Sequence, residues 1–218
     1  MKQGAIFDMD GLMFDTERLF RESWLVLARD KYHVEPSIPF TAAVAGTAGD
    51  KMREVVKSFY PDIDADAYIA DCYARVEEIS ARDLPVKKGL EKILSGLKEK
   101  NFRMAVASAS SRAVIVRNLK KAGVESYFDL VLSTRGEGIP SKPAPDVFIR
   151  AAEGLGLDPR DCYVFEDGIN GVLAGLRAGC TTVMVPDTME PTKEIIEGGA
   201  VICRDLEEAM EAISKGEI

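Results

Sequence analysis

Two aspartates follow an apolar run near the start of the chain, within the segment AIFDMDGLMFDTE. Asp8 comes directly after the run at positions 5–7, and Asp10 lies two residues further on. A carboxylate at the end of a buried strand costs free energy unless a cation or hydrogen bonds compensate its charge, so the pair favours chemistry over packing. We therefore treat Asp8 and Asp10 as candidate catalytic residues.

Three later apolar runs also lead into polar residues. Ser108 and Ala109 lie in MAVASAS, Lys142 lies in SKPAPD, and the acidic pair Glu166 and Asp167 lies in VFEDGING. In an open parallel sheet the ligand crevice lies outside the carboxyl ends of the strands. We therefore expect these hydroxyl, ammonium and carboxylate groups to converge with the two aspartates at one edge of a sheet.

Carboxylates that converge on one point repel each other unless a cation lies between them. Mg²⁺ fits best, because it prefers oxygen ligands and retains water, whereas Zn²⁺ favours the nitrogen and sulfur ligands of histidine and cysteine. Such an ion and Lys142 together could hold a phosphate even on an acidic protein. The hydroxyl of Ser108 and nearby backbone amides are suited to donate hydrogen bonds to the phosphate oxygens.

Each of these residues also has an ordinary structural explanation. An aspartate or serine after a strand commonly caps a turn or helix, and a lysine before a proline is usually a solvated surface residue. An acidic pair before a helix is favoured by the helix dipole. These explanations leave the coincidence of suitable residue types at four strand ends unexplained, so the set as a whole indicates a metal and phosphate site.

The order of the expected elements indicates an α/β fold. No strand pattern occurs between Phe14 and Arg82, where helical spacing of apolar residues predicts three helices and a proline-containing connection at 36–39. From Pro85 onward, β-type runs alternate with amphipathic stretches, which is typical of a parallel sheet covered by helices. We assign residues 1–14 and 83–218 to an α/β core and 15–82 to an all-helical insertion. The three predicted helices run from a cap at 15 or 16 to about 32, from 50 to 59, and through 69–79.

Composition excludes several classes of function. The formal charge of −8 argues against non-specific binding to nucleic acid or to an anionic membrane. No signal peptide or membrane-spanning run is evident, so we expect a cytoplasmic protein, and no heptad pattern demands a partner, so we expect a monomer. The four cysteines form no close pair, which predicts buried free thiols. The single histidine, His33, lies in a polar stretch, which argues against a Ser-His-Asp hydrolase.

The motifs DMDGLMFDTE, VASAS, SKPAPDVF and EDGING resemble, in this order along the chain, the four motifs of the haloacid dehalogenase (HAD) superfamily. The likeness is to the branch with an all-helical cap, which contains sugar-phosphate phosphatases and β-phosphoglucomutase. The resemblance implies a Rossmann-like parallel-sheet core with the helical cap inserted after the first motif. It also implies a Mg²⁺-dependent phosphatase that acts on a small phosphorylated metabolite, which we expect to be a sugar phosphate, through an aspartyl-phosphate intermediate.

The resemblance also implies a role for each site residue. Asp8 becomes the nucleophile and Asp10 the general acid and base, while Lys142 orients and neutralises the phosphoryl group. Ser108 and Ala109 bind that group. The implied Mg²⁺ ligands are Asp8, the backbone carbonyl of Asp10, and Asp167 with or beside Glu166.

The chain departs from this family pattern at three positions. Gly168 stands where the family often has serine. Phe20 and Gly49 stand where the mutase branch has a histidine and a phosphate-binding arginine. A mutase must grip a bisphosphate at both ends, so these departures favour hydrolysis, although Lys51 or Arg53 could replace the missing arginine.

A third alternative is a non-enzymatic switch that keeps its phosphate on an aspartate. Such switches also use an aspartate, a lysine, a hydroxyl and an acidic pair. Asp10 and the helical insertion count against this reading, because a carboxylate two residues after the nucleophile promotes hydrolysis of the aspartyl phosphate.

Overall fold

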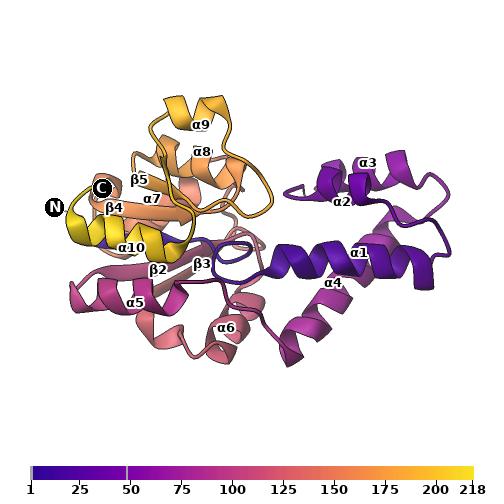
Figure 1. The fold of residues 1–218 in the computed structure, drawn as a ribbon, viewed down its shortest axis with the longest axis horizontal. Coiled ribbons are helices and arrows are strands. Elements are labelled where there is room, and N and C mark those ends of the chain that lie inside the picture. The colour runs from indigo at the N-terminus through magenta and orange to yellow at the C-terminus, as the bar shows by residue number, and fades with distance from the viewer. Residues whose placement is uncertain (1, 48) are drawn as a thin grey trace. The chain divides into compact units, whose positions relative to one another are not determined.

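The computed structural model describes residues 2–47 and 49–218 and divides into two compact units. One unit combines the chain up to Phe14 with Val86–Ile218, and the other is formed by Asp15–Pro85. In Figure 1 the first unit carries all the labelled strands and α5 to α10, and the second carries α1 to α4.

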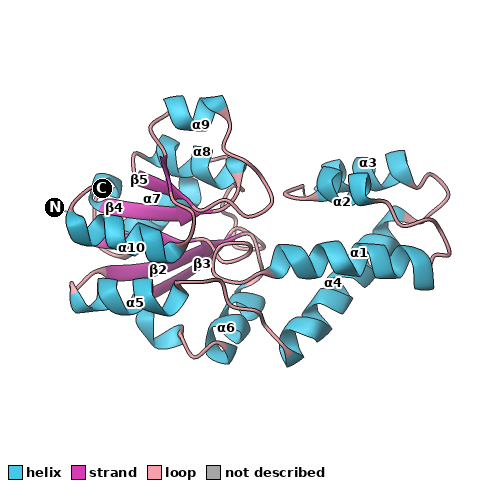
Figure 2. Ribbon diagram, viewed as in Figure 1, coloured by secondary structure: helices cyan, strands magenta, loops and turns pink. Residues whose placement is uncertain are grey.

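The first unit contains a parallel sheet of six strands, counted over the described residues, in the order β3-β2-β1-β4-β5-β6 (Figure 2). The chain lays strands to one side of β1 and then crosses to its other side at β4, which makes the β1–β4 boundary the topological switch point. The strands are β1 (Gly4–Phe7), β2 (Arg103–Ser108), β3 (Leu130–Ser133), β4 (Cys162–Glu166), β5 (Thr181–Met184) and β6 (Val201–Ile202).

Apolar residues on both faces hold the sheet between helices. All residues of β1 and β4 are buried, as expected for parallel strands covered on both sides. Ile6 and Val164 pack in one cluster with residues of α7 and α8, while the rings of Phe7 and Phe165 stack at 4.7 Å between centroids. The helices of this unit are α5 (Leu90–Glu99), α6 (Arg112–Lys121), α7 (Asp146–Gly154), α8 (Ile169–Ala178), α9 (Lys193–Glu197) and α10 (Leu206–Lys215), with short 3-10 turns at Glu125–Tyr127 and Pro159–Asp161.

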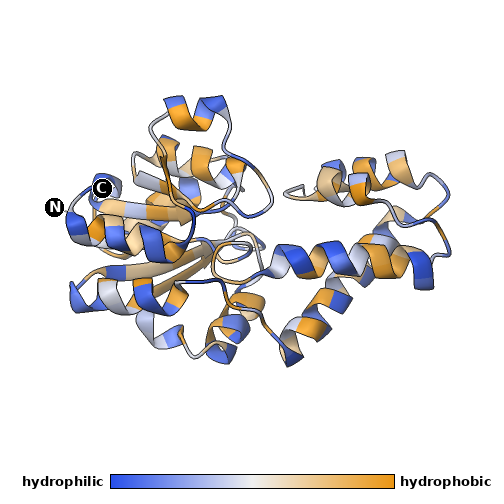
Figure 3. Ribbon diagram, viewed as in Figure 1, coloured by the Kyte–Doolittle hydropathy of each residue, from blue (hydrophilic) through white to orange (hydrophobic). Residues whose placement is uncertain are grey.

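The regular secondary structure of the second unit consists of helices. This unit has its own core of aromatic side chains. Trp24, Phe40 and Tyr68 are buried and pack ring to ring, and the Tyr68 hydroxyl donates a hydrogen bond to the carbonyl oxygen of Trp24 at 2.7 Å. Figure 3 shows apolar and polar residues interspersed along these helices, as amphipathic helices require. The helices are α1 (Thr16–Asp30), α2 (Ile38–Val44), α3 (Gly49–Phe59) and α4 (Ala65–Arg82).

The two ends of the second unit meet. The backbone N–H of Asp15 donates to the carbonyl oxygen of Pro85 at 2.9 Å. Directly before and after these residues, Phe14 and Val86 of the first unit form an antiparallel bridge. The chain therefore leaves and re-enters the first unit at one place.

The predicted α/β fold with a parallel sheet is confirmed, and so are the three predicted helices of the second unit. The structure corrects two local details. Helix α2 begins within the connection predicted at 36–39. Ser37 caps this helix by accepting a hydrogen bond from the Phe40 N–H at 3.2 Å, and Pro39 lies in its first turn. Asp15, one of the two predicted caps, occupies the N-cap position of α1, but its side chain makes no capping hydrogen bond and pairs with Arg18 at 2.9 Å instead.

The four cysteines are buried and free, as predicted. Burial raises the pKa of the Cys162 thiol to about 11, which keeps it protonated and unreactive at neutral pH. Among the helices of the described residues, none combines the length and the apolar character needed to cross a membrane.

Gly89 precedes α5 and lies against the first turn of α10. A substitution at this position tests how closely the two helices pack. The φ of Gly89 is +86°, and a Cβ there lies 2.3 Å from the backbone nitrogen of Glu207. We expect Gly89→Ala to lower the free energy of unfolding by about 2–4 kcal/mol, because backbone strain and a clash with main-chain atoms add together. Urea unfolding followed by circular dichroism measures the loss.

Gly123→Ala is the matched control. Gly123 also has a positive φ, of +70°, but a Cβ there meets nothing within 4 Å. This variant should lose only about 1 kcal/mol from the left-handed backbone conformation. Equal losses in the two variants would contradict a clash at Gly89.

Candidate active site

The register of the sheet places Asp8 beside the end of β4. Phe7 pairs with Phe165, and the backbone N–H of Asp8 continues this pairing by donating to the Phe165 carbonyl oxygen at 3.0 Å. Asp8 thus lies level with Glu166, the last residue of β4, at the switch point of the sheet. Only 7% of Asp8 and 3% of Glu166 are exposed.

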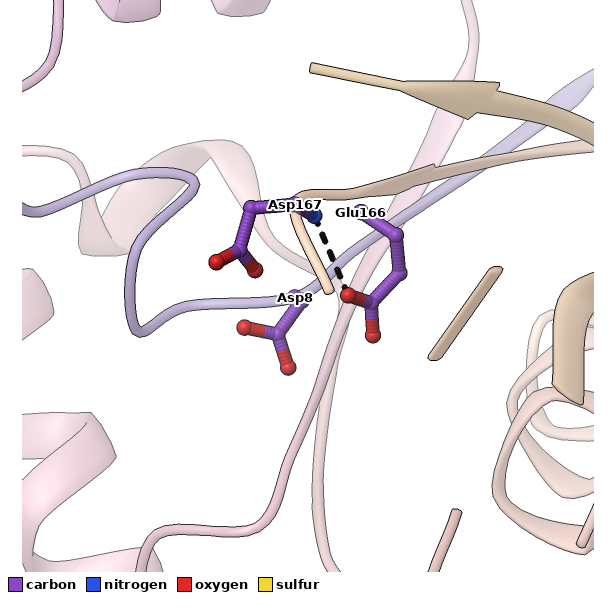
Figure 4. A group of neighbouring side chains, drawn as sticks. All are labelled: Asp8, Glu166 and Asp167. Carbon is purple, nitrogen blue, oxygen red and sulfur yellow. Dashed lines mark hydrogen bonds between the residues drawn. The ribbon is translucent and has the colours of Figure 1, made fainter. Parts of the chain in front are cut away.

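Three carboxylates form one acidic group at this edge. One oxygen each from Asp8, Glu166 and Asp167 lies within 4.8 Å of the others. Figure 4 shows the carboxylates of Asp8 and Asp167 directed to the same side, and it marks the hydrogen bond from the Asp167 N–H to Glu166 Oε2 at 3.1 Å. The sequence prediction that these residues converge therefore agrees with the structure.

Lys142 provides the counter-charge. Its Nζ lies 2.5 Å from Asp8 Oδ1 and 2.6 Å from Glu166 Oε1, and it donates a third hydrogen bond to the Ala107 carbonyl oxygen at 3.0 Å. The side chain is only 10% exposed. Burial alone lowers the pKa of Lys142, but Asp8 and Glu166 outweigh this effect and raise it above its usual value, so the ammonium group stays charged.

Glu166 is held on both of its oxygens. Oε1 pairs with Lys142, and Oε2 accepts hydrogen bonds from the backbone N–H groups of Asp167 and Gly168 at 3.1 and 3.2 Å. The pKa of Glu166 is raised to about 7, because burial and the nearby charge of Asp8 together outweigh the lowering by Lys142. Glu166 is thus a fixed structural member of the acidic group.

The charges and donor atoms of this group fit a hard divalent cation. The group has three carboxyl groups beside one ammonium, so its formal charge is −2 when Glu166 is ionised and −1 when Glu166 is protonated, at a site largely removed from water. The donors of the group are carboxylate oxygens, which suit Mg²⁺ better than metals that prefer nitrogen or sulfur.

Two glycines make room for the acidic pair. A Cβ on Gly11, whose φ is +84°, lies 2.1 Å from Asp167 Oδ2, and a Cβ on Gly171 lies 1.8 Å from Glu166 Oε1. No larger residue fits at either position while the two carboxylates keep their places. The positions of Glu166 and Asp167 therefore depend on these glycines.

The carboxylate of Asp10 lies among hydroxyl groups. Asp10 Oδ2 accepts a hydrogen bond from Ser110 Oγ at 2.7 Å and a longer one from Ser108 Oγ at 3.4 Å. Ser108 is fully buried and its Oγ also accepts from the Ser110 N–H at 3.0 Å, whereas Ala109 between them is exposed. The sequence analysis did not identify Ser110 as a site residue. Its position two residues after Ser108 was a signal that it lies at the same strand end.

The comparisons with known proteins agree with this geometry. A family model described as "Haloacid dehalogenase-like hydrolase" matches residues 5–185. The chain belongs to this family. The matched segment contains all four motifs of the sequence analysis, and the predicted membership of the haloacid dehalogenase superfamily is confirmed.

Two curated relatives and one solved structure show the likeness in detail. The chain is 30% identical to a fructose-1-phosphate phosphatase of Escherichia coli, over 84% of this chain and 95% of that protein. It is 26% identical to a phosphorylated carbohydrates phosphatase of Thermotoga maritima, over 98% and 99% of the two chains. The fold matches a β-phosphoglucomutase of Clostridium difficile with a TM-score of 0.74 at 23% identity, over 99% of this chain and 96% of that one.

Gly171 tests the packing of the acidic group. Gly171→Ala places a methyl group where the Glu166 carboxylate lies, so this carboxylate must move away from Lys142. We expect the free energy of unfolding to fall by at least about 2 kcal/mol, because the substitution overfills a buried site and disturbs a buried ion pair. Urea unfolding measures the change.

Gly168→Ala is the control, three residues earlier. A Cβ there meets Glu166 Oε2 at 3.9 Å, which is an ordinary contact. This variant should stay within about 0.5 kcal/mol of the wild type. If Gly171→Ala were as stable as Gly168→Ala, the close approach of Glu166 to α8 would be wrong.

Proposed function

We propose that this protein is a Mg²⁺-dependent phosphatase that hydrolyses a small phosphorylated metabolite, with a sugar phosphate as the expected substrate. The observation that carries the proposal is the position of Asp8, between the ammonium of Lys142 and the carboxylate of Asp167. A carboxylate held there is suited to attack phosphorus. Family membership and the two carbohydrate phosphatases among the relatives support the same reaction.

The proposed reaction has two steps. First, a carboxylate oxygen of Asp8 forms a bond to phosphorus while the bond from phosphorus to the alcohol oxygen breaks, and Asp10 gives its proton to the leaving alkoxide. This leaves an aspartyl phosphate, an acyl phosphate, on Asp8. Asp10, now ionised, then takes a proton from water as the water oxygen attacks phosphorus, which releases inorganic phosphate and restores Asp8.

Lys142 and Ser108 prepare the site for an anionic group. The ammonium of Lys142 offsets the charge of Asp8 and so lowers the repulsion between this carboxylate and an incoming phosphate. The hydroxyl of Ser108, at the end of β2, is suited to donate a hydrogen bond to a phosphoryl oxygen. These roles are part of the proposal, as is that of the adjacent backbone at Ala109.

We assign the Mg²⁺ ligands to Asp8, the carbonyl oxygen of Asp10, and Asp167. Glu166 lies beside them as the partner of Lys142, because its two oxygens already bind an ammonium and two backbone N–H groups. When bound, Mg²⁺ shields the nucleophile from the phosphate charge and stabilises the charge that develops during transfer.

The β-phosphoglucomutase reaction is the main alternative, because it uses the same nucleophile. A mutase needs cationic groups to hold the second phosphate of a bisphosphate. The two candidates in the helical unit are engaged with carboxylates: Arg53 pairs with Asp50 at 2.5 Å and Asp66 at 2.6 Å, and Lys51 pairs with Glu54 at 3.3 Å. These pairs join exposed side chains and contribute little to stability, so a phosphate could displace them. The preference for hydrolysis rests instead on Phe20 and Gly49, which stand where the mutase branch has a histidine and a phosphate-binding arginine.

Asp8→Asn tests the nucleophile. The amide cannot form the aspartyl phosphate, so we expect phosphate release from sugar phosphates to fall at least about 10³-fold, while circular dichroism stays unchanged. Asp158→Asn, on the exposed turn before β4, is the control and should keep wild-type activity. Substantial turnover by Asp8→Asn would contradict covalent catalysis at this residue.

Metal removal tests the cofactor. Thorough chelation should abolish phosphate release, and added Mg²⁺ should restore it. Asp167→Asn should raise the Mg²⁺ concentration needed for half-maximal activity by at least about tenfold, because it removes a charged ligand. Activity that survives chelation would refute the metal assignment.

Product analysis separates the phosphatase from the mutase. The wild-type protein is incubated with a hexose 1-phosphate, Mg²⁺ and a trace of the hexose bisphosphate. We expect inorganic phosphate to accumulate. Conversion to the 6-phosphate without phosphate release would establish the mutase reaction, and an aspartyl phosphate that persists for minutes would establish a phospho-accepting switch.

A further inference from the structure

We propose that Ser110 is a positioning residue that holds the carboxylate of Asp10 for proton transfer, and that Ser133 anchors Ser110. This inference rests on the proposed function, since it assigns a role within the same reaction. It concerns residues that the sequence motifs did not single out. Ser110 acts through Asp10 and needs no contact with the substrate for this role.

The contact between Ser110 and Asp10 is short and directed. Ser110 Oγ donates to Asp10 Oδ2 at 2.7 Å, which is an ideal distance for a hydroxyl and a carboxylate. Ser108 Oγ lies farther from the same oxygen, at 3.4 Å. Of these two serine hydroxyls, that of Ser110 therefore makes the closer contact with the Asp10 carboxylate.

Ser133 fixes the backbone of Ser110. Its Oγ donates to the Ser110 carbonyl oxygen at 2.7 Å and accepts a hydrogen bond from the Arg135 N–H at 3.0 Å. Ser133 is itself fully buried at the end of β3, where it pairs in register with Ser108 of β2. A buried strand end thus supports the loop that carries Ser110.

This arrangement is what a proton donor at Asp10 requires. As the bond from phosphorus to the leaving oxygen breaks, the proton of Asp10 must reach that oxygen, and a misdirected carboxyl group cannot deliver it. A hydrogen bond to Oδ2 fixes the carboxylate plane and assigns the transferable proton to Oδ1. The effect matters most when the leaving group is a basic alkoxide and least when it is a weakly basic phenolate.

The test is therefore the dependence of Ser110→Ala on the leaving group. The probes are 4-nitrophenyl phosphate and the sugar monophosphate that the wild type hydrolyses fastest in a panel. The value of kcat/KM reports the steps up to formation of the aspartyl phosphate on Asp8. We expect it to fall about 10–100-fold for the sugar phosphate and less than about twofold for 4-nitrophenyl phosphate.

Three further variants sharpen the result. Ser110→Thr keeps the hydroxyl and should restore most of the activity on the sugar phosphate. Ser133→Ala should give a smaller loss with the same dependence on the leaving group. Ser111→Ala is the control and should match the wild type, because Ser111 precedes α6 without a side-chain capping hydrogen bond.

The outcomes distinguish this inference from the proposed function. If the wild type releases no phosphate from any probe, the proposed function fails. If the wild type is active but Ser110→Ala loses nothing, or loses equally on both probes while remaining folded by circular dichroism, the positioning role of Ser110 is wrong. Failure of Ser110→Thr to recover activity would also overturn it.

Discussion

The whole site depends on the ammonium group of Lys142. It lies between carboxylates from two neighbouring strands, at 2.5 Å from Asp8 and 2.6 Å from Glu166, and it is itself almost buried. Without this charge, two ionised carboxylates would face each other in a medium that screens them poorly. Lys142 makes the close approach of Asp8 and Glu166 energetically acceptable, and it leaves an excess of negative charge that a metal ion can match.

The parallel sheet explains why these groups meet. The strands of a parallel sheet all end at the same edge, and ligands of such sheets generally bind beside the switch point, which here lies between β1 and β4. Backbone register then sets the finer positions, because Asp8 lies level with Glu166 and Ser108 lies level with Ser133. The acidic group thus adjoins two strands, β1 and β4, that are buried along their whole length.

The sequence allowed the α/β fold and the acidic group to be predicted, because apolar runs mark strands and strand order determines which ends meet. It could not show that Ser110 contacts Asp10, since that contact depends on how the turn after β1 directs a carboxylate. Helix α2 was missed because proline usually signals an interruption, whereas Pro39 lies in a first turn, where it is tolerated. Asp15 occupies one of the two predicted N-cap positions of α1 without a capping hydrogen bond from its side chain, a detail of side-chain direction that residue type alone does not determine.

The hydrogen bond between Asp15 and Pro85 bears on how the helical segment between these residues can be replaced. The two ends of this segment touch. If the segment is removed or replaced, the residues before and after it still lie close enough to be joined by a short connection. The entropy lost on closing such a segment grows only slowly with its length. Helical units of different size or sequence can therefore be exchanged at this point while the sheet and the acidic group at its edge are retained.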